Sequence, residues 1–123
     1  MRVYSRVVLI LALTLIFVSH SSGQETLWKE LNVEMADLYR QGKYQEAVKV
    51  AERAVEVAEK TFGPDHLRVA ISLNNLATLY RLQGRYGEAE SLYKHSLDMK
   101  ERVMGSNHPK VATALNNLAG LYR

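Results

Sequence analysis

The sequence predicts an all-α protein in which antiparallel helix hairpins stack into a solenoid. Residues 41–81 recur 42 positions later as residues 83–123, and 18 of the 41 aligned pairs are identical. A fixed period of this length is typical of repeat architectures, in which each unit buries its apolar face against its neighbours. Apolar residues follow helical spacing from residue 26 onward, with no strand-like alternation. The two prolines, Pro64 and Pro109, both lie at predicted joints between helices.

Residues 1–23 have the pattern of a secretory signal peptide. Arg2 and Arg6 flank the start of an apolar run at residues 7–18 that only Thr14 interrupts. This run is shorter than the roughly 20 residues that a membrane-spanning helix needs. Small residues favour cleavage before Gln24, although cleavage after Ser21 fits nearly as well. We therefore expect export to the periplasm or out of the cell, and an uncleaved membrane anchor is the alternative.

Charge and cysteine content exclude several classes of partner. The chain has 16 basic and 13 acidic side chains, and removal of Arg2 and Arg6 with the signal leaves 14 basic against 13 acidic. Without a block of like charge, we expect neither nucleic acid nor, after signal cleavage, a membrane as partner. The absence of cysteine excludes disulfides and thiolate metal sites. Stability must therefore come from packing.

The mature chain, residues 24–123, is expected to form one domain of about two and a half repeats. Its repeats are expected at about 24–65 and 66–107, with a partial one at 108–123. The predicted helices lie at about 25–40, 44–61, 66–82, 86–103 and 108–122. The fifth helix copies the third, and its partner helix is absent.

Loop chemistry predicts where the helices begin and end. Gly42 and Gly84 lie where a tight turn requires a left-handed backbone. Asp65 and Asn107 are expected to cap the third and fifth helices, because their side-chain oxygens can accept hydrogen bonds from the first exposed amides. Pro109 fits the first turn of the fifth helix.

The pattern L-A-x-L-Y-x-x-Q-G-x-Y-x-E-A…Y…L at residues 76–97 resembles the tetratricopeptide repeat. The matching positions are Leu76, Ala77, Tyr80, Gly84, Tyr86, Ala89, Tyr93 and Ser96, of which Ser96 stands where the family usually has alanine. The period of 42 exceeds the common 34. Together with G-x-x-H-P-x-V-A at residues 105–112, it is similar to the kinesin-light-chain type. The resemblance covers essentially all of residues 24–123 and implies a right-handed solenoid.

The first repeat departs most from the pattern, with Met35 and Ala36 in the leucine and small positions. A further L-Y-R at residues 38–40 matches residues 79–81 if one residue is missing before Gln41. Tyr39, Tyr80 and Tyr122 are then expected in core or turn positions.

The resemblance implies that the first helix of each hairpin lines a concave, ligand-facing side. The expected ligand-contacting residues are Asn74, Asn75, Thr78, Arg81, Thr113, Asn116, Asn117, Arg123 and Arg40. Asparagine can both donate to and accept from a peptide backbone. The arginines, one per repeat, could pair with a carboxylate. As alternatives, the asparagines bridge adjacent helices and the arginines belong to a solvated face.

His66 and His108 recur one period apart, which could suggest a metal site. No carboxylate or cysteine cluster accompanies them, so we expect them to contribute to the starts of their helices instead. We expect no metal and no cofactor.

Catalytic motifs are missing from the sequence. It contains no cysteine nucleophile, no glycine-rich phosphate loop, no H-E-x-x-H and no G-x-S-x-G. Two and a half hairpins also enclose little space for a substrate. We expect a protein that is not an enzyme.

Two functional hypotheses follow. The first is an exported interaction module or scaffold that binds an extended or helical peptide in the concave groove. The second is the N-terminal part of a longer array, an accessory domain of a larger protein, or a chain that self-associates end to end through its uncovered fifth helix.

Overall fold

The structure is a computed structural model that describes residues 22–122, and these residues form helices joined by short loops. A helix at residues 22–40, here called the N-terminal helix, is followed by α2 (Tyr44–Phe62), α3 (Leu67–Leu82), α4 (Tyr86–Met104) and α5 (Pro109–Leu121). The five expected helices are therefore confirmed, with ends that differ by up to three residues. The expected signal lies almost entirely outside the described residues. Within them, no helix is long and apolar enough to span a membrane.

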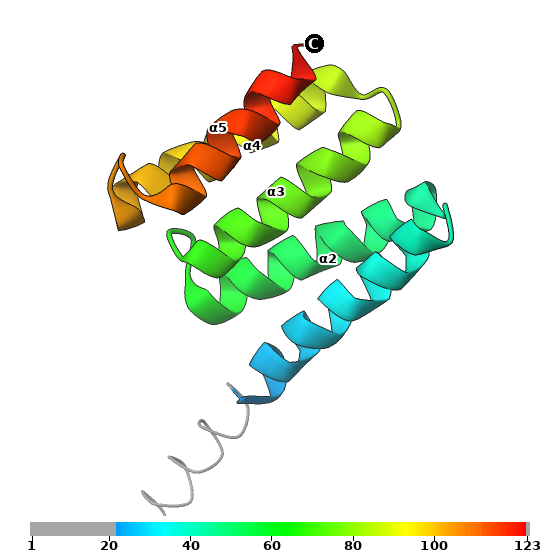
Figure 1. The fold of residues 1–123 in the computed structure, drawn as a ribbon. Helices are drawn as coiled ribbons and strands as arrows, with labels where there is room; N and C mark the ends of the chain where they lie inside the picture. The colour runs from blue at the N-terminus through cyan, green and yellow to red at the C-terminus, as the bar shows by residue number, and fades with distance from the viewer. Residues whose placement is uncertain (1–21, 123) are drawn as a thin grey trace, which may run out of the picture.

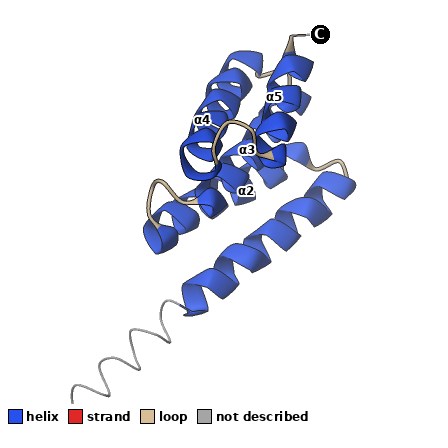
Figure 2. Cartoon of the chain, turned by 60° about the vertical axis from the view of Figure 1, so that its left-hand side comes forward, coloured by secondary structure: helices blue, strands red, loops and turns tan. Residues whose placement is uncertain are grey.

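The helices lie in chain order from the N-terminal helix to α5 (Figures 1 and 2). Among α2 to α5, α3 packs against α2 and most extensively against its hairpin partner α4, while α5 packs against α4. Each helix thus buries its apolar face mainly against its neighbours in sequence. This is the neighbour-to-neighbour packing of a helical solenoid that the 42-residue period predicts.

Small residues on α2 and α4 allow the helices to approach closely. Ala47 and Ala89 occupy the same repeat position on α2 and α4, and both are fully buried. Ser96, at the position usually occupied by alanine, is also fully buried, and its hydroxyl donates to the carbonyl oxygen of Ala70 at 2.8 Å. The hydroxyl therefore fits without an unsatisfied polar group.

The turns after the N-terminal helix and after α3 are the same. Gly42 and Gly84 have φ angles of 75° and 77°, as expected. Lys43 N donates to Leu38 O at 2.9 Å, and Arg85 N donates to Tyr80 O at 2.8 Å. Leu38 therefore corresponds to Tyr80 at an offset of 42, and no residue is missing before Gln41.

The register expected for the first repeat was therefore wrong by one residue. The triplet at residues 38–40 only resembles residues 79–81 in letters, because the turn hydrogen bonds fix the alignment. Burial agrees, since Leu31 and Leu73 are both 4% exposed and lie 42 residues apart. Tyr39 thus takes the place of Arg81.

Histidines, and not their neighbours, cap α3 and α5. His66 Nδ1 accepts from Arg68 N at 3.0 Å, and His108 Nδ1 accepts from Lys110 N at 3.1 Å. This confirms their expected part in helix initiation. The caps expected at Asp65 and Asn107 were wrong, because each helix begins one residue later than the pattern indicated.

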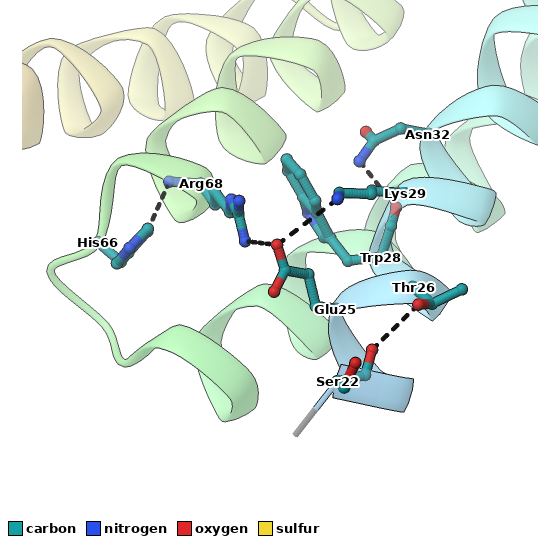
Figure 3. Close-up of polar contacts among 8 residues, drawn as sticks. All are labelled: Ser22, Glu25, Thr26, Trp28, Lys29, Asn32, His66 and Arg68. Carbon is teal, nitrogen blue, oxygen red and sulfur yellow. Dashed lines mark hydrogen bonds and ion pairs between the residues drawn. The ribbon is translucent and has the colours of Figure 1, made fainter. Parts of the chain in front are cut away.

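The N-terminal helix is held against α3 by polar and aromatic contacts, of which Figure 3 shows the ion pair between Glu25 and Arg68. The indole Nε1 of Trp28 donates to Ser72 Oγ at 2.8 Å, and Arg68 forms an ion pair with Glu25 at 2.7 Å. The Arg68 guanidinium also lies 4.6 Å from the ring centre of Phe62 on α2. These contacts join three helices at one end of the N-terminal helix.

Candidate functional site

A groove runs between the N-terminal helix and α3, on the side where the ligand-facing residues were expected. Its volume is about 200 Å³, and it is lined by Met35, Ala36, Tyr39, Asn75, Thr78 and Leu79. In the corrected register, Ala36 corresponds to Thr78, so both helices present the same repeat position. The groove therefore lies between the first helices of two successive hairpins.

The groove combines apolar walls with a few polar groups. Tyr39 is 45% exposed. Its ring lies 5.8 Å from that of Tyr44, on the other side of the turn between the N-terminal helix and α2. Thr78 Oγ1 lies 3.0 Å from Asn74 O and 2.8 Å from Tyr93 OH. An apolar hollow with few fixed polar groups is what binding sites usually offer.

Three other surface hollows are larger, and charged residues surround each of them. Hollows of about 550 and 620 Å³ lie over α2, and one of about 480 Å³ lies over the N-terminal helix. Long charged or amide side chains, including Lys49 and Glu34, form much of their walls. We take the smaller groove as the candidate because it lies between the first helices of two successive hairpins, where a ligand was expected.

Of the expected ligand-contacting residues, the structure brings Asn75 and Thr78 into the groove. Asn74 and Asn117 instead join α3 to α5, since Asn117 Nδ2 donates to Asn74 Oδ1 at 3.3 Å. This is the bridging role that was the alternative expectation. It leaves these two side chains less available to a ligand.

The expected residues on α5 lie apart from the groove. Thr113 and Asn116 are exposed, and the Thr113 hydroxyl donates to Pro109 O at 3.2 Å. A ligand that reached them would have to extend past α3.

The arginines do not form the expected ladder of one per repeat. Arg40 is out of register with Arg81 and forms an ion pair with Asp37. Arg81 is exposed near the end of α3, and Arg123 lies outside the described residues. The row of aligned arginines that was expected to bind a carboxylate therefore lacks an arginine from the first repeat.

Sequence reasoning missed Tyr39 as a groove residue and placed it in the core or turn. Tyr80 is indeed core, at 8% exposed, whereas Tyr122 is 62% exposed and donates to Glu90 Oε1 at 2.7 Å. The signal that could have found Tyr39 is the distance to the turn glycine. Tyr39 precedes Gly42 by three residues, as Arg81 precedes Gly84.

The hydrogen bond from Tyr80 OH to Glu52 Oε1, at 3.1 Å, links α3 to α2 behind the groove. Burial, together with this bond to the carboxylate, raises the pKa of Tyr80 above its usual range. Tyr80 therefore stays protonated at neutral pH and acts here as a structural donor. Within residues 22–122, His, Asp and Glu do not gather in the threes that a metal ion needs.

Comparison with known protein families agrees with the repeats described above. The family model described as tetratricopeptide repeat matches residues 30–102, which is more than half of the chain. The chain belongs to the tetratricopeptide repeat family. Domains of this family are in general protein–protein interaction modules. No curated protein matches the chain.

Among solved structures, BtubC (BKLC) from P. vanneervenii is similar, with a TM-score of 0.75 and 25% sequence identity. The likeness covers 80% of this chain and 39% of BtubC, so the chain spans less than half the length of that relative. With the 42-residue period, it supports a tetratricopeptide repeat protein of the kinesin-light-chain type.

Proposed function

We propose that this protein is an exported interaction module that binds a peptide segment of another protein in the groove between the N-terminal helix and α3. The groove itself carries the proposal, because its walls come from the first helices of two successive hairpins, the side on which a ligand was expected. Tyr39 offers an exposed aromatic surface beside the amide of Asn75. Aromatic side chains of this kind frequently dominate the binding energy of protein interfaces.

The size of the groove favours a peptide side chain over a small-molecule substrate. Its volume of about 200 Å³ is below the roughly 300–1,000 Å³ of ordinary ligand pockets. The sequence also lacks the common catalytic motifs. In the proposed function, the protein therefore acts by binding, without catalysis and without a cofactor.

Export is part of the proposal and rests on residues 1–23. Cell fractionation followed by N-terminal sequencing tests it. A mature protein that begins at Gln24 or Ser22 outside the cytoplasm supports export. A full-length chain in the membrane fraction would instead support the uncleaved anchor.

A pull-down from the native extracytoplasmic fraction tests the groove. The wild-type protein is compared with the double variant Tyr39→Ala and Asn75→Ala, and with the matched control Thr113→Ala and Asn116→Ala on α5. Proteins recovered by the wild type and the control but lost with the groove variant are the expected partners. Equal recovery by all three proteins would sink the groove assignment.

A second candidate function, as part of a longer array or a self-associating scaffold, is favoured by α5. Leu115 is 47% exposed, whereas its counterpart Leu73 on α3 is 4% exposed. Tyr122 and its counterpart Tyr80 are 62% and 8% exposed. The apolar face that α4 covers on α3 is thus largely uncovered on α5. Patches of this kind often mark interaction surfaces.

Head-to-tail stacking is the less favourable form of self-association. Glu30, Glu34 and Asp37 occupy the positions of Ser72, Leu76 and Leu79, which α3 buries. Stacking another repeat on the N-terminal helix would bury these acids, and an unpaired buried charge is costly. A polar outer face is what terminal repeats require for solubility. If copies associate, we expect them to meet through α5.

A further inference from the structure

Asn32 carries a buried acceptor without a partner. Its Nδ2 donates to Trp28 O at 2.8 Å, which is visible in Figure 3. Its Oδ1 is buried and has no hydrogen-bond partner, the one such side-chain atom in the part of the chain that the structure describes. Leaving a buried acceptor unpaired costs free energy, so such atoms are rare in folded proteins.

The next repeat shows which residue is placed to satisfy it. Asn117 Nδ2 donates to Asn74 Oδ1, and these residues are 43 positions apart. The pair one repeat earlier is Asn75 and Asn32, also 43 positions apart. Because the two turns have the same hydrogen bonds, the offset between corresponding residues is the same in both repeats. Asn75 lines the groove, so this pair would connect the groove to the N-terminal helix.

We propose that Asn32 is a positioning residue, which accepts one amide N–H of Asn75 and thereby aims the other edge of that amide into the groove. The proposal rests on the proposed function and deepens it. A side-chain amide has one oxygen acceptor and two N–H donors. When the N–H trans to the carbonyl points to Asn32, the carbonyl and the second N–H lie together on the free edge.

That free edge fits the backbone of an extended peptide. It can accept from the N–H and donate to the C=O of one peptide residue at the same time. A helical ligand already uses these groups in its own i to i−4 hydrogen bonds. The structure therefore favours an extended segment over the helical one that the sequence left open.

Thr78 cannot supply the donor in place of Asn75. Its hydroxyl has one proton, and its oxygen lies within hydrogen-bond distance of both Asn74 O and Tyr93 OH. If the proton goes to Asn74 O, Tyr93 donates to Thr78; otherwise Thr78 donates to Tyr93. In either case no Thr78 proton remains for a ligand.

The first test follows the side-chain amide of Asn75 by NMR in the ¹⁵N-labelled protein. Asn32→Leu replaces the amide by an apolar side chain of similar size, and Asn116→Leu on exposed α5 is the control. We expect one Asn75 amide proton to show hydrogen-bonded shift and slowed exchange in the wild type and the control, and to lose both in Asn32→Leu. Asn75 resonances that do not respond to Asn32→Leu would overturn the proposal.

The second test uses a 12-residue peptide, selected from a random displayed library for binding that Tyr39→Ala with Asn75→Ala abolishes. We expect Asn32→Leu to weaken this peptide about tenfold while thermal unfolding and Trp28 fluorescence stay unchanged. Replacing one backbone amide of the peptide by an ester, which removes an N–H, should weaken binding by a similar factor.

The outcomes separate the two proposals. A groove-dependent peptide that binds Asn32→Leu as tightly as the wild type, or that binds as a helix, contradicts the role of Asn32 but leaves the groove intact. If selected peptides bind with no dependence on Tyr39 and Asn75, the proposed function itself is wrong.

Discussion

Gly84 is a residue whose backbone, not its surroundings, determines the cost of replacing it. Its φ angle of 77° lies in the left-handed region, yet a Cβ added there would meet no atom within 4 Å. Gly87, in the first turn of α4, has the same open space without the positive φ. The two glycines therefore separate backbone strain from steric crowding.

We predict that Gly84→Ala lowers the free energy of unfolding by about 1 kcal/mol, the penalty of a left-handed conformation for an L-residue. Gly87→Ala should leave stability unchanged or raise it by up to about 1 kcal/mol, because alanine loses less conformational entropy in a helix. Urea unfolding measures both. A Gly84→Ala variant that is no less stable than Gly87→Ala would contradict the role assigned to the left-handed backbone.

Lys100 is a charged residue at a position where the first repeat has a small one. It is 8% exposed, and its counterpart Ala58 is fully buried. Burial, and secondarily the nearby Lys110, lower the pKa of the Lys100 ammonium. The folded state therefore disfavours the charged form, and this destabilisation applies below the lowered pKa and fades as pH rises toward the unfolded value of 10.5.

Lys100→Met removes the buried charge and should raise the free energy of unfolding at pH 7 by about 1 kcal/mol, a gain that single stabilising substitutions commonly give. The gain should shrink as the pH approaches 10. Chemical unfolding at both pH values checks the prediction. A gain that is the same at pH 7 and pH 10 would assign the effect to packing alone.

At the scale of elements, the N-terminal helix depends on contacts that the second repeat does not have. Glu25, Trp28 and Arg68 are replaced one period later by Leu67, Ala70 and Lys110. The bond to Arg68 holds the pKa of the Glu25 carboxyl below its usual 4.5. A carboxyl with a lowered pKa stabilises the fold above the unfolded value, and this contribution is lost as pH falls through the lowered folded pKa.

The fluorescence of Trp28, the single tryptophan of the chain, reports on this contact. We predict that lowering the pH from 6 to 3 shifts its emission toward that of exposed indole as the N-terminal helix loosens. Because Glu25 is at the surface, the effect is expected to be small. Glu25→Gln should already show this shifted Trp28 emission at pH 6. Lowering the pH to 3 should then change the emission of this variant little further. An identical titration in both proteins would exclude Glu25 as its origin.

Sequence periodicity was sufficient to predict the helices and the turns, because apolar spacing and glycine placement act locally. It failed for the register of the first repeat, because this register depends on backbone hydrogen bonds that the sequence does not show. The triplet at residues 38–40 suggested a shifted register, whereas the bond from Lys43 N to Leu38 O fixes the offset at 42. Half of the groove was missed for this reason, and Tyr39 with it. The pairing of Asn74 with Asn117 also depends on how α5 packs beside α3.

At the scale of the whole molecule, the two ends of the repeat array differ in chemistry. The outer face of the N-terminal helix carries Glu30, Glu34 and Asp37, and α5 leaves Leu115 and Tyr122 exposed. The charged end opposes further stacking, while the apolar end favours it. Of these two ends, α5 is therefore the one suited to self-association.

Sedimentation over a range of protein concentrations tests this asymmetry. If copies associate, we predict a dimer and no larger polymer, because α5 can pair with α5 only once. Leu115→Asp should convert the dimer to a monomer. Glu34→Leu, on the N-terminal helix, should leave the dimer unchanged. Open-ended polymers in the wild type would contradict the account and support head-to-tail stacking.

The groove is the central claim, and site-specific photo-crosslinking in the native extracytoplasmic fraction tests it most directly. A photoreactive amino acid replaces Ala36 in the groove wall or, as a control, the exposed Glu56 on α2. The account predicts that a protein partner attaches at position 36 and not at position 56, and that Tyr39→Ala with Asn75→Ala abolishes the product. Attachment of the same partner at position 56 alone, or an unchanged product in the double variant, would contradict it.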